Sequence, residues 1–244
     1  MFFKYVLLFF IYSFIGWFYE TVLCSVEEKK LINRGFLRGP YCPVYGFGAV
    51  IDIIVLDKID NIFVLFFLGI VLTCSLEYFT SWLLEKLFNA RWWDYSYMKF
   101  NIKGRICLLG AIIFGLFSVL LIKLLHPFVM SLINKIDYGY LVFVTIVITL
   151  IFTVDLVITV NRLLIFNNKL RELQEFLASK KLISNIKTAV SMDEGLITNF
   201  KDKLHDLIAK FTAHDKRLLK SFPRFKSTRY NEAINKIREY FNKQ

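Results

Sequence analysis

Four stretches of this chain are long and apolar enough to cross a lipid bilayer as helices: residues 3–23, 62–84, 105–126 and 139–165. A helix that rises 1.5 Å per residue needs about 20 mostly apolar residues to cross the hydrocarbon core of a bilayer. Hydrophobic residues make up 56% of the chain and the mean hydropathy is +0.51, which is more apolar than a water-soluble domain. The sequence therefore predicts an all-α, polytopic membrane helix bundle.

A shorter apolar segment, residues 44–57, lies between the first two stretches and holds Gly46, Gly48 and Asp52. It is either a full span that begins inside the preceding loop or a re-entrant segment. We favour a full span, because five spans place the basic loops of the chain consistently. The expected transmembrane domain then covers residues 1–165 and contains about five spans.

Lys and Arg are concentrated in two of the loops between the spans. Loops 24–43 and 85–104 hold four basic residues each, whereas segments 58–61 and 127–138 hold one each. Short loops rich in Lys and Arg stay in the cytoplasm. Five spans with the N-terminus outside bring both basic loops and the C-terminus to the cytoplasmic side, and four spans would separate the loops. We therefore expect a multi-pass protein of the cytoplasmic membrane with a cytoplasmic C-terminus.

Residues 166–244 are strongly basic, with 17 Lys and Arg against 9 Asp and Glu, a net charge of +8. Their apolar residues recur at helical spacing, which predicts an amphipathic helix on each side of a break at Ser191–Gly195. Pro223 should end the second helix, and a short third helix is expected at about 230–241. We expect a cytoplasmic helical tail. Because the front of the chain is so apolar, a membrane surface suits this charge better than nucleic acid does.

The two basic loops have unusual sequences. Residues 33–48, NRGFLRGPYCPVYGFG, contain four Gly and two Pro, which forbid a regular helix and require tight turns. Residues 91–96, RWWDYS, and 100–105, FNIKGR, combine Trp and Tyr with charged groups. Non-helical backbone near membrane depth persists only where its polar groups are satisfied, so we expect the first loop to pack against the spans. The alternatives are a plain connector for the first loop and, for Trp92, Trp93 and Tyr95 of the second, an interfacial aromatic belt.

Three acidic residues lie within the four long apolar stretches: Glu20, Glu77 and Asp155. A charge at the bilayer centre costs about 2.5–3.5 kcal/mol on insertion scales, so such residues usually face the bundle interior and have partners. One interpretation is structural pairing with Arg34, Arg105 or Arg162. The other is a polar cavity open to the cytoplasm, in which the acids face arginines of the loops.

The loops and the buried acids together suggest one polar site at the inner membrane face. Arginines in such a site would suit an anionic ligand, because the guanidinium fork matches phosphate or carboxylate. The acids could instead bind a cation or transfer a proton. The candidate polar site consists of Glu20, Asn33, Arg34, Arg38, Tyr41, Tyr45, Glu77, Asp94, Asn101, Arg105 and Asp155.

Two other kinds of site are not expected from the sequence. The four cysteines, Cys24, Cys42, Cys74 and Cys107, stand singly, so free thiols are expected and no metal site. No G-x-x-x-x-G-K-[ST] run occurs, so the chain has no nucleotide site of that type. We therefore expect neither a metal nor a cofactor.

The runs NRGFLRGPYCPVYGFG, WWDYS and FNIKGRICL, with the lead-in residues Gly16, Trp17 and Glu20, resemble an ABC-transporter permease family of Gram-positive bacteria, its type IV membrane component. The resemblance covers residues 8–125 well and departs from the family pattern at Phe114, where the family has Trp. It implies an integral protein of the cytoplasmic membrane and carries over no catalytic residue. A permease without a nucleotide motif needs a separate ATPase subunit. Five spans also make a small translocation unit, so a homodimer is expected.

Three functions are compatible with these features. The first is a permease-like subunit, which the resemblance and the acids within spans favour. The second is a membrane-embedded enzyme acting on a lipid or isoprenoid headgroup, because Arg, Glu, Asp and Tyr gather on one side of the bilayer. Against the enzyme, the two loops contain no His. The third is a membrane scaffold or regulator whose basic tail binds anionic lipid, each Lys or Arg contributing about 1 kcal/mol near such a leaflet.

Overall fold

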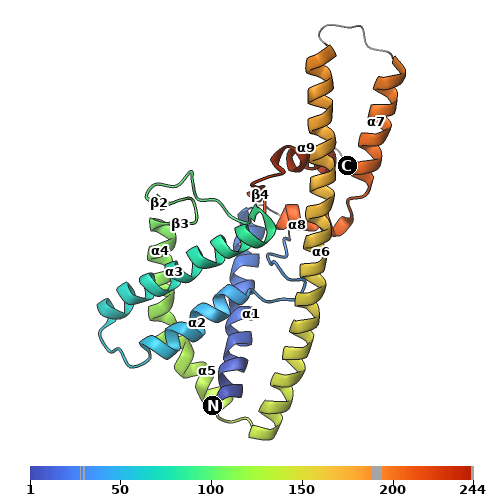
Figure 1. The fold of residues 1–244 in the computed structure, drawn as a ribbon. Coiled ribbons are helices and arrows are strands. Elements are labelled where there is room, and N and C mark those ends of the chain that lie inside the picture. The colour runs from blue at the N-terminus through green and yellow to red at the C-terminus, as the bar shows by residue number, and fades with distance from the viewer. Residues whose placement is uncertain (28, 30, 188–193, 243–244) are drawn as a thin grey trace. The chain divides into compact units, whose positions relative to one another are not determined.

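The chain is an all-α membrane helix bundle, as predicted (Figure 1). The computed structural model describes residues 1–27, 29, 31–187 and 194–242. The chain divides into two compact units, each considered by itself below. The bundle unit comprises Met1–Leu83 and Trp93–Thr159, and the tail unit comprises Leu84–Trp92 and Val160–Gln244.

The helices of the bundle unit are α1 (Phe2–Glu27), α2 (Pro43–Leu56), most of α3 (Ile62–Phe88), α4 (Leu108–Leu120), a π-helical turn η1 (Leu121–Leu125) and α5 (His126–Ile133). Helix α6 (Tyr138–Lys187) begins in the bundle unit and ends in the tail unit, which also contains α7 (Glu194–Ala209), α8 (Ala213–Ser221) and α9 (Asn231–Asn242). The short strands are β1 (Ala90–Arg91), β2 (Asn101–Ile102), β3 (Ile106–Cys107) and β4 (Lys226–Ser227). Strand β1 pairs with β4 and β2 with β3, both antiparallel.

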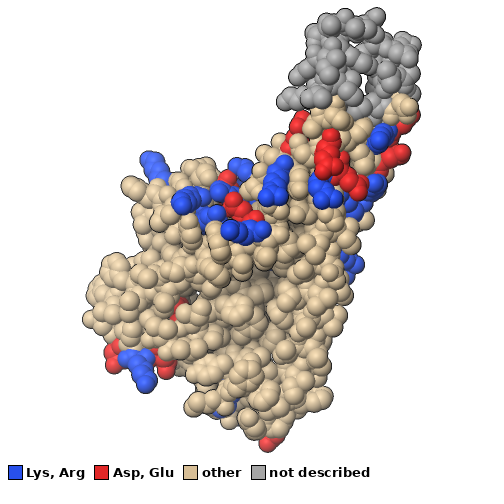
Figure 2. Space-filling model, in the orientation of Figure 1, with Lys and Arg blue, Asp and Glu red and all other residues tan. Residues whose placement is uncertain are grey.

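Among the described residues, four helices are long and apolar enough to cross a membrane: Phe2–Val26, Ile62–Phe88, Leu108–Ile133 and Tyr138–Ser179. They overlap the four long apolar stretches of the sequence. Large side chains such as Phe63 and Phe143 are exposed on them, as on a surface that lies against lipid tails. On the face that Figure 2 shows, most of the bundle unit is uncharged, and its charged residues gather toward its ends.

Helix α2 has 14 residues, so it is about 21 Å long and shorter than a bilayer core of roughly 30 Å. It lies beside α1, and the two helices approach closely at two glycines (Figure 1). A Cβ at Gly16 of α1 would overlap the ring of Tyr45, and one at Gly46 of α2 would overlap the Ser13 side chain and the Phe9 backbone. Small residues allow such close packing between membrane helices. This crossing fixes the ring of Tyr45 against α1.

The entry segment, residues 31–42, is not helical and runs antiparallel along one face of α1. The amide of Ile32 donates to the Ser25 hydroxyl at 3.0 Å, and the amide of Cys42 donates to the carbonyl oxygen of Ser13 at 2.9 Å. Twelve residues of helix separate Ser13 from Ser25, which is about 18 Å at 1.5 Å per residue. The entry segment therefore follows α1 for about 18 Å before α2 begins.

Two further hydrogen bonds between these two anchors keep the entry segment on α1. The Arg34 amide donates to the Thr21 hydroxyl at 3.3 Å, and the Trp17 indole N–H donates to Asn33 Oδ1 at 2.7 Å. Asn33 Nδ2 also lies 3.5 Å from the carbonyl oxygen of Arg38, within the segment itself. Residues 13, 17, 21 and 25 are four apart, so they share one face of α1. Polar groups of this face satisfy the non-helical backbone, which apolar surroundings would otherwise leave without partners.

The helix that contains α4 and α5 is interrupted by a π-helical turn, η1. Its last hydrogen bond runs from the His126 amide to the carbonyl oxygen of Leu121, five residues earlier. Pro127 accounts for the turn, because proline lacks an N–H and its ring clashes with the carbonyl four residues before it. The turn brings Leu121 and Leu125 to the wall of the cavity described below.

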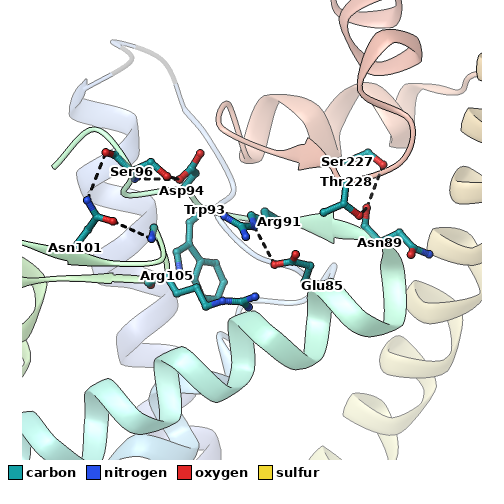
Figure 3. Close-up of polar contacts among 11 residues, drawn as sticks. Glu85, Asn89, Arg91, Trp93, Asp94, Ser96, Asn101, Arg105, Ser227 and Thr228 are labelled. Carbon is teal, nitrogen blue, oxygen red and sulfur yellow. Dashed lines mark hydrogen bonds and ion pairs between the residues drawn. The ribbon is translucent and has the colours of Figure 1, made fainter.

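The tail unit has its own core. Trp92 is 3% exposed and packs edge-to-face against Phe222 and Phe225, with ring centroids 5.0 and 5.2 Å apart. The carbonyl oxygen of Asn89 accepts hydrogen bonds from the amide and hydroxyl of Thr228 at 2.8 and 3.0 Å, which ties the end of α3 to β4 (Figure 3). Trp92 is therefore a core residue and not part of an interfacial belt. Further buried members of this core are Leu170, Leu173, Leu218, Ile234 and Ile237.

The tail helices differ from the sequence prediction at one point. The second amphipathic stretch was expected to run unbroken to Pro223, but α7 ends at Ala209 and α8 begins at Ala213. Thr212 starts α8 with a capping box, in which its side chain and that of Asp215 each accept from the other residue's backbone. The predicted break at Ser191–Gly195 falls mainly on residues 191–193, outside the described residues.

Candidate functional site

The bundle unit contains a cavity of about 340 Å³. Its walls come from α1, α2, α3 and the helix formed by α4 and η1, together with Arg34 of the entry segment and Trp93 and Tyr95. Residues 93–107, which include Trp93 and Tyr95, are called the hairpin loop below. Along α1 the cavity extends from Glu20 to Tyr12, about 12 Å at 1.5 Å per residue. Both unusual loops of the sequence thus border one cavity.

Glu20 of α1 joins two residues at the polar end of the cavity. The Tyr45 hydroxyl donates to Glu20 Oε1 at 2.6 Å, and Arg34 Nε lies 3.5 Å from Glu20 Oε2. The side chains of Arg34 and Glu20 are 20% and 27% exposed, so water weakens this ion pair only in part. The carboxylate of Glu20 therefore opposes the charge of Arg34 and positions the hydroxyl of Tyr45.

Glu77 of α3 is the second acid at the polar end, and it is 8% exposed. The hydroxyl of Tyr95 donates a hydrogen bond of 3.4 Å to Glu77 Oε1. Burial, and then the carboxylates of Glu77 and Glu20, raise the pKa of Tyr95 well above its usual value. The Tyr95 hydroxyl therefore keeps its proton at neutral pH and remains a hydrogen-bond donor to Glu77.

Asp155 of α6 belongs to a different cluster, which holds the entry segment. The amides of Arg38 and Gly39 lie 3.0 and 2.8 Å from Asp155 Oδ2, and the Tyr41 hydroxyl donates to the same oxygen at 2.8 Å. Thr159 contributes a hydroxyl 3.3 Å from Oδ1. Arg38 takes part through its backbone amide, so two amides of the entry segment and the hydroxyls of Tyr41 and Thr159 satisfy this acid.

The hairpin loop is built around Asn101, which is labelled in Figure 3, and Gly104. The Arg105 amide donates to the carbonyl oxygen of Ile102 across a turn whose central residues, Lys103 and Gly104, have φ angles of +52° and +68°. Two positive φ angles are typical of a type I′ hairpin turn, which favours glycine. Asn101 Oδ1 accepts from the Gly104 amide at 2.9 Å, and its Nδ2 donates to the carbonyl oxygen of Met98 at 2.7 Å. Asn101 therefore shapes the loop.

Asp94 and Arg105 lie at the base of the same loop, and both are 7% exposed. Asp94 accepts hydrogen bonds from the amide and the hydroxyl of Ser96 (Figure 3). The Arg105 guanidinium lies over the Tyr78 ring, with Cζ 5.3 Å from its centroid, and the Arg105 carbonyl oxygen accepts from the Trp93 indole at 3.1 Å. These contacts fix the loop and aim Trp93 at the cavity.

The structure brings only part of the predicted site together. Glu20, Arg34, Tyr45 and Glu77 line the cavity. Within the described residues, the other candidates are not among those that line it. Asn33, Arg38, Tyr41 and Asp155 hold the entry segment, and Asp94, Asn101 and Arg105 shape the hairpin loop.

Asp52 was missing from the predicted site, yet it lines the cavity. It is 2% exposed, and the Ser118 hydroxyl of α4 donates to its Oδ2 at 2.6 Å. Seven residues separate Asp52 from Tyr45 along α2, which places it about 10 Å further along the helix. The signal for it in the sequence was its position as an acid in the interior of the apolar segment 44–57, whose other acid, Asp57, is the last residue of the segment. An acid in such surroundings is a candidate for function by itself.

These features define an integral membrane protein made of apolar helices, with a cavity inside its bundle and acids on three of the helices around it. Residues 7–160 match the family model described as "Putative ABC-transporter type IV". The chain belongs to this family. Comparison with curated proteins and with solved structures gives no match. The matched region contains every residue that lines the cavity, and most of the tail unit lies beyond it.

Proposed function

We propose that this chain is the membrane subunit of an ABC-type transporter and that the cavity of about 340 Å³ binds its substrate. The observation that carries the proposal is the placement of Glu20, Asp52 and Glu77 on three helices around one cavity. Carboxyl groups are costly among apolar helices, and where they occur they usually mark a binding or transfer path. Family membership supports the same class of function.

The depth of the cavity favours transport over chemistry at a lipid headgroup. A headgroup enzyme needs its polar groups at the membrane surface, and the hairpin loop holds the strongest candidates for such a site. Asp94, Asn101 and Arg105 are instead engaged in the turns and stacking of that loop. Asp52, in contrast, lies about 10 Å along α2 from Tyr45, between apolar helices. A path of polar groups along the helices suits a substrate that moves across the membrane.

Contacts within the tail unit favour the transporter hypothesis over the hypothesis of a scaffold that binds anionic lipid through its positive charge. Lys169 forms an ion pair of 2.9 Å with Asp215, and Lys210 forms one of 2.8 Å with Glu172. Part of the basic character therefore serves internal contacts in this unit. In the transporter hypothesis, the tail unit is the surface on which a separate ATPase subunit docks.

The proposed orientation places the start of the entry segment, the hairpin loop and the C-terminus on the cytoplasmic side, because the loops that contain them are rich in Lys and Arg. In this proposal the entry segment and α2 cross the bilayer as one discontinuous span. About 18 Å of non-helical chain and about 21 Å of helix are together long enough for a core of roughly 30 Å. Discontinuous spans of this kind border the binding sites of many transporters.

Single cysteines test the orientation. The starting protein has its four cysteines replaced by alanine. One cysteine at a time is then introduced at an exposed position, as Lys29→Cys, Lys99→Cys or Lys135→Cys. In intact cells, a membrane-impermeant maleimide should label position 135 alone, and in inverted vesicles it should label positions 29 and 99. Labelling of 29 and 99 from opposite sides would contradict the orientation.

Purification from native membranes tests the transporter assignment. The tagged full chain should copurify with a protein that carries a P-loop ATPase motif, and the reconstituted complex should hydrolyse ATP. Glu77→Gln should lower the substrate-stimulated part of this hydrolysis, whereas Asp60→Asn, a change of an exposed acid outside the cavity, should not. A chain that binds no ATPase and supports no hydrolysis in proteoliposomes would rule the proposal out.

A further inference from the structure

The cavity has an excess of carboxyl groups over basic groups. Asp52, Glu20 and Glu77 line it, and Arg34 is its single basic lining residue among those the structure describes. The Arg34 guanidinium lies 3.5 Å from the carboxylate of Glu20, so these two charges offset each other. Asp52 and Glu77 remain as the acids without a basic residue beside them in the cavity wall. This balance suits a positively charged ligand, in contrast to the anion that the loop arginines suggested.

One oxygen of Asp52 points to the kind of group that the ligand carries. Oδ2 accepts from Ser118, but Oδ1 is buried and has no hydrogen-bond partner among the residues that the structure describes. A buried polar atom of this kind costs about 1–3 kcal/mol unless it finds a partner. Because Asp52 lines the cavity and is 2% exposed, that partner can come from a molecule inside it. A positively charged hydrogen-bond donor forms a stronger hydrogen bond with a carboxylate than a neutral donor does.

Aromatic rings form much of the remaining wall. Tyr12 and Tyr19 of α1, Phe114 and Phe117 of α4, and Trp93 of the hairpin loop all line the cavity. The Tyr19 and Phe117 rings pack edge-to-face at 5.1 Å, which holds both rings in place. Ring faces attract cations as well as apolar groups, and rings combined with carboxyl groups are typical of sites for organic cations. The volume of about 340 Å³ admits a molecule with one or two rings.

We infer that the cavity binds an amphiphilic organic amine, whose ammonium group donates to Asp52 Oδ1 while its apolar body lies against the aromatic wall. The inference deepens the proposed function and rests on it only for the assignment of the amine as transported substrate. Binding itself depends on the cavity of the bundle unit alone. Glu77 at the polar end adds a second carboxyl group to the cavity wall.

Three ligands of one shape test the charge preference. The full chain is purified and placed in lipid nanodiscs, and calorimetry measures binding of 3,3-diphenylpropylamine, 3,3-diphenylpropanol and 3,3-diphenylpropionate, with empty nanodiscs as the blank. These compounds share one apolar body and differ in having a cationic, neutral or anionic end. The amine should bind at least about tenfold more tightly than the alcohol, as expected for a hydrogen bond to a charged group, and the carboxylate should bind most weakly. Equal affinities for the three would overturn the inference.

Two substitutions connect the preference to this site. Asp52→Asn should reduce amine affinity about tenfold or more and leave alcohol affinity unchanged, and Asp60→Asn, which removes an exposed acid, should change neither. Gly48→Leu keeps Asp52 but fills the cavity, because Gly48 is a lining position from which a leucine side chain extends into the space. The backbone tolerates the change, since a Cβ at Gly48 meets Leu76 Cδ2 at an ordinary distance of 3.6 Å. Gly48→Leu should abolish binding of the amine. It tests the site independently if Asp52→Asn does not fold well enough to be purified. Unchanged amine binding in Gly48→Leu would show that the amine binds elsewhere.

The outcomes also separate this inference from the proposed function. Selective amine binding by a chain that has no ATPase partner supports the site and rejects the transporter. A chain that couples to an ATPase but binds the three ligands alike supports the transporter and rejects the amine as its substrate.

Discussion

The hydroxyl of Tyr41 donates a hydrogen bond of 2.8 Å to Oδ2 of Asp155, so a side chain of the entry segment is held by an acid on α6, 114 residues later in the chain. The same oxygen accepts from the Gly39 amide at 2.8 Å. These contacts explain how an acid can lie within an apolar helix and how a segment without helical hydrogen bonds can lie beside it. They also make Asp155 a structural residue whose removal has a measurable cost.

Asp155→Ala should lower the free energy of unfolding by about 3 kcal/mol, because it removes a charged acceptor and leaves two backbone amides of the entry segment without a partner. Asp155→Asn, which keeps one acceptor oxygen, should cost less. Thermal unfolding of the purified protein in detergent measures both variants. Thr153→Ala on the same helix serves as control, since Thr153 only donates to the Thr149 carbonyl of its own helix. Similar melting temperatures for Asp155→Ala and the control would contradict this role.

The crossing of α1 and α2 yields a prediction from a matched pair of glycines. Gly46→Ala should destabilise the protein by about 1–3 kcal/mol, because its Cβ would overlap the Ser13 side chain and the Phe9 backbone. Gly48→Ala, two residues along the same helix, should be neutral or stabilising, because its Cβ finds only an ordinary contact with Leu76. Melting temperatures of the two variants should differ by several degrees. Equal values would mean that the helices are not packed at Gly46.

Length and composition were sufficient to predict the membrane-spanning helices, because the bilayer imposes one requirement on all of them. The predicted contact of the first loop with the spans also followed from a general rule, since its backbone needs partners near membrane depth. The partners themselves were not predictable. Asp155 is satisfied by amides of Arg38 and Gly39, and every residue has such an amide, so no sequence pattern identifies them. Their identity depends on how the entry segment lies between two helices.

Neighbours in the sequence also separate in the structure in a way that the pattern WWDYS does not reveal. Trp92 belongs to the core of the tail unit, and Trp93 lines the cavity of the bundle unit. Asp52 was overlooked because its role depends on the rotation of α2 about its axis, which the Gly16 and Gly46 contacts fix. Periodicity predicts that such a helix exists, but contacts with other elements decide which face meets the cavity.

The separation of the two tryptophans can be tested through Trp92. Trp92→Ala removes a ring that is 3% exposed and packs against Phe222 and Phe225, so it should destabilise the tail unit by about 3–5 kcal/mol. Limited trypsin digestion should then cut the chain after basic residues of the tail unit much faster than in the unmodified protein. Tyr97→Ala, at a position 59% exposed, should leave the digestion rate unchanged. Equal rates for the two variants would place Trp92 outside a folded core.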